Sequence, residues 1–176
     1  MKTFGLIGHR LGYSFSRNFF TEKFAKENLQ EHEYVNFELD SIDEFPGIFD
    51  GEKIICGLNC TIPYKQQIMQ FLDEIDPEAA QIGAVNTVKI TSKDGKRLLK
   101  GFNTDIYGFE NSLRPMLEEK HRKALILGTG GASKAIKHIL NKLNIEYVSA
   151  SIEEQLFEKE IRYNQIDEQL LKEYLI

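Results

Sequence analysis

The pattern of apolar and polar residues divides the first part of the chain into alternating strands and helices. An apolar run at residues 2–8 ends in glycine and predicts a first strand. The stretch after it carries apolar side chains at roughly helical spacing, namely Phe19, Phe20, Phe24 and Leu29. Residues 34–39 alternate as a second strand and residues 52–57 form a third, with a short helical turn and a loop at 41–51 between them. This βαβ order predicts a parallel sheet.

The third strand leads into the sequence Gly57–Lys65, which we expect to join a strand to a helix. Proline suits the first helical position because it has no N–H to satisfy there, so Pro63 predicts a helix that continues through residues 66–72. Thr61 stands before this proline in the place of an N-cap. Open α/β sheets bind their ligands outside the carboxyl ends of strands, so this junction is a favourable place for a site.

Shorter elements complete the first half of the chain. Residues 76–82 carry an Asp-Pro pair at their start and predict a short helix, and residues 83–90 predict a strand. A turn at 93–96 joins that strand to residues 97–101. These two strands therefore form a predicted hairpin.

A second βαβ pattern follows. A helix is expected after residue 101, with Asn103 or Thr104 as its N-cap. Residues 122–127 predict a strand, the glycine-rich residues 128–133 predict a turn into a helix, and residues 144–149 predict the next strand. This order is typical of a Rossmann-like unit.

The last part of the chain is more strongly charged. Residues 152–159 predict one helix and residues 167–174 another, and a further strand is expected to start at 175–176. The fold class is therefore α/β with two domains, 1–103 and 104–176. We expect the second domain to be incomplete at its C-terminus, because a dinucleotide domain needs more than two or three strands.

Composition narrows the class of protein. The 176 residues are 41% hydrophobic and 28% charged, as in soluble globular proteins. The formal net charge of -5 gives no electrostatic footprint for nucleic acid or an anionic membrane, and no apolar run reaches the roughly 20 residues of a membrane span. We see no secretory signal, and two cysteines (Cys56 and Cys60) are a poor basis for disulfides, so we expect a cytoplasmic protein. The four histidines have no ligand spacing with the cysteines, so no metal site is expected.

Polar groups of three kinds gather where the third strand ends. They are the carboxamide of Asn59, the hydroxyl of Thr61 and the ammonium of Lys65, a set suited to a small polyol or hydroxy acid. The competing interpretation is structural, because threonine and asparagine before a helix are usually caps and lysine in a first turn is usually solvated. Asp105, in the first turn of a later helix, is the candidate partner that would keep Lys65 charged.

Two hydroxyls form a second candidate site at the start of the first helix. Ser14 and Ser16 either cap that helix or hold a carboxylate. The second role is open to them because unpaired amide groups at a helix N-terminus favour anions.

The glycine-rich turn is the third candidate site. Residues 128–132 read G-x-G-G-A between a strand and a helix, which predicts dinucleotide binding. Glycines permit a tight turn and let a pyrophosphate approach the helix N-terminus. The second strand ends at Ser149–Ser151 without the acid that would bind the ribose of NAD, which favours NADP, although no arginine is visible to hold the 2′-phosphate.

Four motifs resemble those of the shikimate dehydrogenase family in order and spacing. They are Gly57–Lys65 (G-x-N-V-T-x-P-x-K in the family), Gly83–Thr87 (G-A-V-N-T), Gly101–Phe109 (G-x-N-T-D-x-x-G-F) and Gly128–Ala132 (G-x-G-G-A). The resemblance spans about residues 4–148. It implies an NADP-dependent oxidoreductase of aromatic amino-acid biosynthesis, which reversibly reduces 3-dehydroshikimate to shikimate. It also implies a substrate domain followed by a Rossmann-like NADP domain.

The resemblance further implies roles for individual residues. Lys65 and Asp105 would be the catalytic pair. The residues implied to bind shikimate are Ser14, Ser16, Thr61, Lys65, Asn86 and Asp105, with the serines on its carboxylate. Those implied to bind NADP are Gly128, Thr129, Gly130, Gly131, Ala132 and Ser149. Beyond its small-molecule substrate we expect no nucleic-acid or membrane partner, and we expect a monomer or homodimer.

The chain departs from the family pattern in three respects. Arg10, Tyr13 and Arg17 replace a proline, a histidine and a proline around the two serines. Ser149–Ser151 replaces the N-R-T motif that holds the 2′-phosphate. The family's later V-N-T-T-P segment, a C-terminal glutamine that touches shikimate and its returning C-terminal helices have no counterpart, as a truncated chain would show. Two alternatives stay open: an NAD-using quinate/shikimate dehydrogenase, and a non-catalytic ligand-binding relative.

Overall fold

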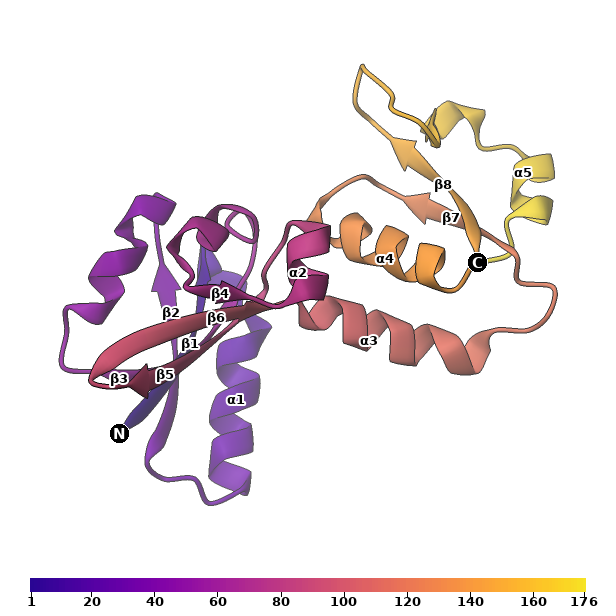
Figure 1. Ribbon diagram of the computed structural model, residues 1–176. Coiled ribbons are helices and arrows are strands. Elements are labelled where there is room, and N and C mark those ends of the chain that lie inside the picture. Colours follow the sequence, from indigo (N-terminus) through magenta and orange to yellow (C-terminus); the bar gives the residue numbers. More distant parts are fainter. The chain divides into compact units, whose positions relative to one another are not determined.

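The chain divides into two compact units. In the computed structural model the backbone is described for residues 1–176, and the surroundings of every residue except Gly131. The first unit is Met1–Asn103 and the second is Thr104–Ile176 (Figure 1).

A six-stranded sheet forms the first unit, in the order β2-β1-β3-β5-β6-β4. The strands are β1 (Lys2–Gly8), β2 (His32–Glu38), β3 (Ile54–Cys60), β4 (Glu74–Ile75), β5 (Thr87–Lys93) and β6 (Lys96–Phe102). β1 lies parallel to both β2 and β3, as the βαβ pattern predicts. β5 is antiparallel to β3, with Asn59 opposite Thr87. The carboxyl ends of β1, β2 and β3 therefore meet the start of β5 at one edge.

Both faces of β1 are covered, which explains why residues 4–7 of this strand are apolar. Successive side chains of a strand point to opposite faces. Leu6 packs on the side of the helix α1 (Phe15–Lys26) with Phe20 and Phe24. Ile7 points to the other face, where its cluster includes residues of two 3₁₀ helices, Ile42–Phe49 and Gln67–Phe71.

Two short-range predictions in the first unit are confirmed. The helix α2 (Pro77–Ile82) starts after Asp76, whose carboxylate accepts a hydrogen bond from the Glu78 amide at 3.0 Å. The hairpin of β5 and β6 reverses at Asp94 and Gly95, which have φ of 52° and 75°. Positive φ at both central residues matches the strand twist, and aspartate and glycine are suited to it.

The predicted helix from Pro63 is wrong. Residues 62–66 form turns, the Ile62–Pro63 peptide bond is cis, and the first helical turn starts only at Gln67. In a helix the carbonyl of Lys65 would accept from the amide four residues on. Here it accepts instead from the amide of Val85, at 2.7 Å. A long-range bond therefore takes the acceptor that the helix would need.

The second unit has three parallel strands in the order β7-β8-β9. Its strands and helices are β7 (Lys123–Leu127), β8 (Glu146–Ser151), β9 (Glu160–Arg162), α3 (Thr104–Leu113), α4 (Gly131–Lys142) and α5 (Glu168–Glu173). Its core joins one face of the sheet to α3 and α4 through Leu113, Ala124, Ile126, Leu140 and Ile145. The predicted strand, glycine turn, helix and strand are confirmed.

The predicted helix at 152–159 is wrong too. The guanidinium of Arg162 donates to the carbonyls of Glu153 and Glu154, and the Glu153 amide donates to Ser151 Oγ. Lys159 has a φ of 62°, in the left-handed region. Side chains thus satisfy the backbone groups that a helix would pair internally, and the segment is an irregular loop.

The strand expected to start at 175–176 does not form, although one backbone contact lies there. The carbonyl of Ile176 accepts a hydrogen bond from the Leu125 amide in β7 at 2.9 Å. Within the described part of the chain, no helix is both long and apolar enough for a membrane span.

Candidate active site

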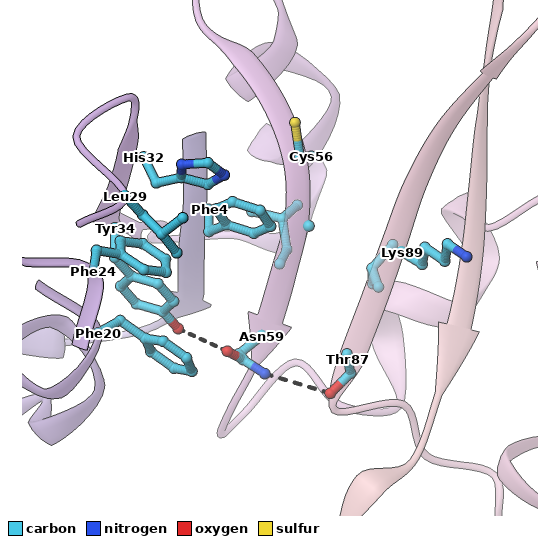
Figure 2. A pocket seen from close by; sticks show the side chains of 13 residues that line it. Phe4, Phe20, Phe24, Leu29, His32, Tyr34, Cys56, Asn59, Thr87 and Lys89 are labelled. Carbon is cyan, nitrogen blue, oxygen red and sulfur yellow. Dashed lines mark hydrogen bonds between the residues drawn. The ribbon is translucent and has the colours of Figure 1, made fainter. Parts of the chain in front are cut away.

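A hydrogen-bonded line of side chains crosses the sheet of the first unit where the strands end (Figure 2). The Tyr34 hydroxyl donates to Asn59 Oδ1 at 2.8 Å, and Asn59 Nδ2 donates to Thr87 Oγ1 at 3.4 Å. The Thr87 hydroxyl in turn donates to Asn86 Oδ1 at 3.0 Å. Asn86 is only 8% exposed. We call Tyr34, Asn59, Thr87 and Asn86 the polar line; its links fix the orientation of each amide.

The two serines lie at the start of α1. Ser14 occupies the N-cap position but makes no capping bond with its side chain, and its Oγ is buried without a partner among the described residues. Such an orphaned hydroxyl is available to a ligand oxygen. Ser16 is hydrogen-bonded to Tyr34 instead. Burial raises the pKa of Tyr34 to about 12, against the smaller effect of that hydrogen bond.

Thr61 and Lys65 reach the same end of the sheet from the turn after β3. The Thr61 amide donates to the carbonyl of Ile7 at 2.9 Å, and its methyl would lie 2.6 Å from a side chain at Gly8. Only glycine at that position allows so close an approach. The Val85 amide donates to the Lys65 carbonyl, so the backbone of Lys65 lies against the residue that precedes Asn86.

The positive charge of Lys65 acts on the strand end. Burial raises the pKa of the Cys60 thiol to about 12, and the Lys65 charge opposes that rise. Cys60 is itself tied to Asn86, whose carbonyl accepts from the Cys60 amide at 2.8 Å. Lys65 is half-buried, and its charge is felt at Cys60, the last residue of β3.

A cavity of about 510 Å³ lies against the polar line but is not the predicted site. Tyr34, Asn59 and Thr87 form one wall, and aromatic residues such as Phe4 and Phe24 form much of the rest (Figure 2). Of the first-unit site residues predicted from the sequence, Asn59 lines it, whereas Ser14, Ser16, Thr61, Lys65 and Asn86 do not. The cavity is an apolar space on the α1 face of the sheet, whereas the candidate site lies at the strand ends.

Asp105 lies in the second unit, in the first turn of α3, and is half-buried. The first unit thus contains Ser14, Ser16, Thr61, Lys65 and Asn86, and the second contains Asp105. Sequence reasoning left Tyr34 and Thr87 out of the site. Little in the sequence indicated them, because Tyr34 and Thr87 lie on different strands and are linked through Asn59.

The glycine turn of the second unit is built from backbone. Gly128 has a φ of 111°, a conformation that other residues rarely adopt, and its amide donates to the carbonyl of Ala150 at 2.9 Å. Gly130 is the N-cap of α4, a helix of 12 residues. A side chain at Gly130 would meet nothing within 4 Å, so the space before this helix is open. An N-terminus with this room suits a phosphate.

The end of β8 carries hydroxyls in place of a charge. Ser149 is fully buried and its Oγ has no partner among the described residues. Ser151 Oγ lies 3.4 Å from Thr129 Oγ1 in the glycine turn and accepts from the Glu153 amide at 3.2 Å. Ser151, which the sequence analysis left out of the site, thus links the glycine turn to the loop after β8. Among the described residues, no group of three metal-ligating side chains is placed to hold a metal ion.

Comparison with known proteins gives one consistent result. A family model described as the shikimate dehydrogenase substrate binding domain matches residues 6–88. A protein named shikimate dehydrogenase (NADP(+)) from Caldanaerobacter subterraneus subsp. tengcongensis is 41% identical over 150 residues, covering 84% of this chain and 51% of that protein. One of the same name from Clostridium botulinum is 38% identical over 182 residues, covering 99% of this chain and 69% of that protein.

A solved structure agrees with these relatives. The crystal structure of shikimate 5-dehydrogenase from Thermus thermophilus in complex with NADP(H) and shikimate is 33% identical, with a TM-score of 0.69 over 86% of this chain and 56% of that one. The chain spans about half the length of the Caldanaerobacter relative. The α/β fold class, with a mostly parallel sheet followed by a Rossmann-like unit, is confirmed. By these matches the chain belongs to the shikimate dehydrogenase family.

Proposed function

We propose that the protein to which this chain belongs catalyses the reversible NADPH-dependent reduction of 3-dehydroshikimate to shikimate. The observation that carries the proposal is the polar line, together with Lys65 in the turn after β3 whose carbonyl bonds to Val85, next to Asn86; all lie inside the range matched by the substrate-binding family model. The Thermus relative, whose structure holds NADP(H) and shikimate, supports the same pair of ligands.

The first unit is assigned to the substrate. The orphaned hydroxyl of Ser14, with Ser16 two residues on, binds the substrate carboxylate at the N-terminus of α1. Asn86 and Thr61 bind ring hydroxyls, since an amide and a hydroxyl each donate and accept hydrogen bonds. In this assignment residues 1–103 are the substrate domain and residues 104–176 the dinucleotide domain.

Lys65 and Asp105 are assigned to the chemistry. NADPH, when bound, supplies a hydride to the carbonyl carbon of the substrate. The carbonyl oxygen then gains negative charge, which the Lys65 ammonium stabilises and neutralises by giving up a proton. Asp105 is the carboxylate assigned to the same reaction by the resemblance, and its role is to favour the charged form of the lysine. In the reverse direction Lys65 accepts the proton from the shikimate hydroxyl.

The residues of the second unit fit a dinucleotide. Gly128 to Ala132 hold the pyrophosphate, because the turn is open and α4 presents its unpaired amides. Thr129 and Ser149 are the polar side chains assigned to the same cofactor. We also propose a cytoplasmic monomer or homodimer that acts on a small molecule, with no nucleic-acid or membrane partner.

A second candidate is a quinate/shikimate dehydrogenase that uses NAD. The observation in its favour is the uncharged end of β8, where Ser149, Ala150 and Ser151 are all buried. A phosphate normally meets a cation, and none of these residues supplies one. A non-catalytic ligand-binding relative is the third candidate, and the retention of both Lys65 and Asp105 weighs against it.

One assay separates these functions. Shikimate-dependent reduction of NADP and, separately, of NAD is measured with the purified protein, and quinate serves as the competing substrate. Turnover of shikimate with NADP supports the proposal. Turnover with NAD alone, or of quinate with NAD, replaces it by the second candidate. A folded protein that binds shikimate without turning it over replaces it by the third.

A further inference from the structure

The end of β8 lacks a charge that an NADP site needs. The 2′-phosphate is a dianion near neutral pH, and arginine is the side chain best matched to it. In a Rossmann-like unit the adenosine ribose lies at the carboxyl end of the second strand, which is β8 here. Ser149, Ala150 and Ser151 occupy that end. The cation must therefore come from another element.

The next strand, β9, supplies a cation close to the end of β8. β9 pairs with β8 in parallel, and Arg162, its last residue, lies opposite Ser151. Neighbouring strands lie about 4.8 Å apart, so the two strand ends border the same space. Arg162 is invisible to a motif search because it follows the second strand by more than ten residues.

The guanidinium of Arg162 is held over the loop that follows β8. Nη1 donates to the carbonyl of Glu153 at 3.4 Å and Nη2 to the carbonyl of Glu154 at 2.7 Å. A guanidinium has five N–H donors, so these two bonds fix its plane and leave others for a ligand. Arg162 is exposed, which keeps those donors accessible.

The same loop is tied to the glycine turn. Ser151 Oγ accepts from the Glu153 amide and lies 3.4 Å from Thr129 Oγ1. Tyr163, which follows Arg162, brings its hydroxyl within 3.9 Å of where a side chain at Gly128 would lie. Arg162 and Tyr163 thus lie at the edge where the glycine turn and the loop after β8 meet.

Other cations of this edge have partners. Lys137 pairs with Glu160 at 3.5 Å, and Lys159 lies 5.0 Å above the ring of Tyr147. Lys134, exposed in the first half of α4, is a further competitor among the described residues. Its position on the helix of the glycine turn relates it to the pyrophosphate rather than to the ribose.

We propose that Arg162, with Ser151 and Thr129, recognises the 2′-phosphate of NADP in this chain, in place of the arginine missing from the end of β8. The inference rests on the proposed function, because it assumes that the second unit binds NADP. It assigns cofactor choice to β9 and to the loop after β8, which Arg162 organises.

Binding measured by calorimetry tests this without turnover. Dissociation constants for NADP⁺ and NAD⁺ are determined for the wild-type protein and for Arg162→Gln, Arg162→Lys and Lys134→Gln. Loss of a charge-assisted hydrogen bond to the phosphate should weaken NADP⁺ binding roughly 10- to 100-fold in Arg162→Gln and leave NAD⁺ binding unchanged. The NADP⁺ affinity of Arg162→Lys should lie between those of the wild type and Arg162→Gln, because lysine keeps the positive charge but lacks the paired donors of a guanidinium.

The outcomes are distinguishable. Equal weakening of both dinucleotides in Arg162→Gln would mean that Arg162 only holds the loop, and would overturn the inference. So would a selective loss in Lys134→Gln with none in Arg162→Gln. A wild-type protein that prefers NAD⁺, with no effect of Arg162, overturns it as well. Binding of neither dinucleotide by the folded wild type overturns the proposed function itself.

Discussion

The two units build their candidate sites in opposite ways. In the first unit, side chains carry the site, and each depends on another: Tyr34 holds Asn59, which holds Thr87, which holds Asn86. In the second unit, the backbone carries it, through the φ of Gly128 and the open space before α4. Hydroxyls such as that of Ser151 lie next to the turn.

This difference determines where each site tolerates change. A chain of buried side chains transmits the loss of one member to the next, because a buried polar group left unpaired is costly. A site made by a backbone turn requires glycine at only a few positions, so the neighbouring side chains can vary. The replacement of N-R-T by Ser149–Ser151 falls in the second unit, whereas Asn59, Asn86 and Thr87 of the polar line match the family motifs; the first-unit departures at Arg10, Tyr13 and Arg17 lie outside this line.

The largest effect is expected from Lys65→Ala. Lys65 meets a negative charge that develops during the reaction, so its removal should reduce kcat by about 10²- to 10⁴-fold with a much smaller change in KM for shikimate. Steady-state kinetics of shikimate-dependent NADP reduction measure both constants. Lys89→Ala is the matched control, because Lys89 is exposed and borders the apolar cavity. A variant that keeps kcat and loses only affinity would remove Lys65 from the chemistry.

The polar line is broken most directly by Asn59→Leu. The substitution keeps the volume but leaves the Tyr34 hydroxyl without its acceptor and Thr87 without a donor. The free energy of unfolding, measured in urea, should fall by about 1–3 kcal/mol. Asn111→Leu is the control, because the Asn111 amide is exposed and bonds only to its own helix. Equal losses in the two variants would contradict the idea that the line acts as a unit.

Much of this architecture could be predicted from the sequence because it is local. The hairpin at Asp94-Gly95 and the cap of α2 at Asp76 follow from residues a few positions apart. The turns at 62–66 could not, because the Lys65 carbonyl bonds to an amide twenty residues away. The helix predicted at 152–159 does not form either, because the Arg162 side chain donates hydrogen bonds to the carbonyls of Glu153 and Glu154.

The candidate site divides in the same manner. Ser14, Lys65 and Asn86 stand in short motifs, and the resemblance assigns them without a structure. Tyr34 joins Asn59 across 25 residues, and Arg162 reaches Ser151 only through strand register. Pairing between strands decides these neighbours, and a single sequence does not contain it.

The two glycines of the turn separate stability from binding. Gly128→Ala forces a side chain into a φ of 111° and should lower the free energy of unfolding by about 1–2 kcal/mol. Gly130 has an ordinary φ of -69° and open space around it, so Gly130→Ala should leave stability unchanged. Its methyl group would nevertheless occupy the room for a pyrophosphate, and NADP⁺ affinity should fall. Urea unfolding and calorimetry give the two readouts, and unchanged affinity in folded Gly130→Ala would move the phosphate site elsewhere.

The smallest effect is a pH dependence that belongs to the first unit. The pKa of Tyr34 is raised from 10.0 to about 12 in the folded protein by burial. Below pH 10 the tyrosine is protonated in both states, so its contribution to stability is fully present there. Between pH 10 and about 12 the unfolded chain gives up this proton first and binds fewer protons than the folded one, so stability falls as the pH rises.

Tyr34→Phe should therefore reduce the loss of stability over that pH range, whatever it does to stability at neutral pH. Urea unfolding at a series of pH values measures the slope. The wild-type slope also includes Cys60, whose pKa is raised by burial, so the variant should flatten the curve without abolishing its fall. Tyr13→Phe, at a fully exposed tyrosine, is the control. If the two variants have the same slope as wild type, Tyr34 is not buried in the folded protein, and the polar line loses its first member.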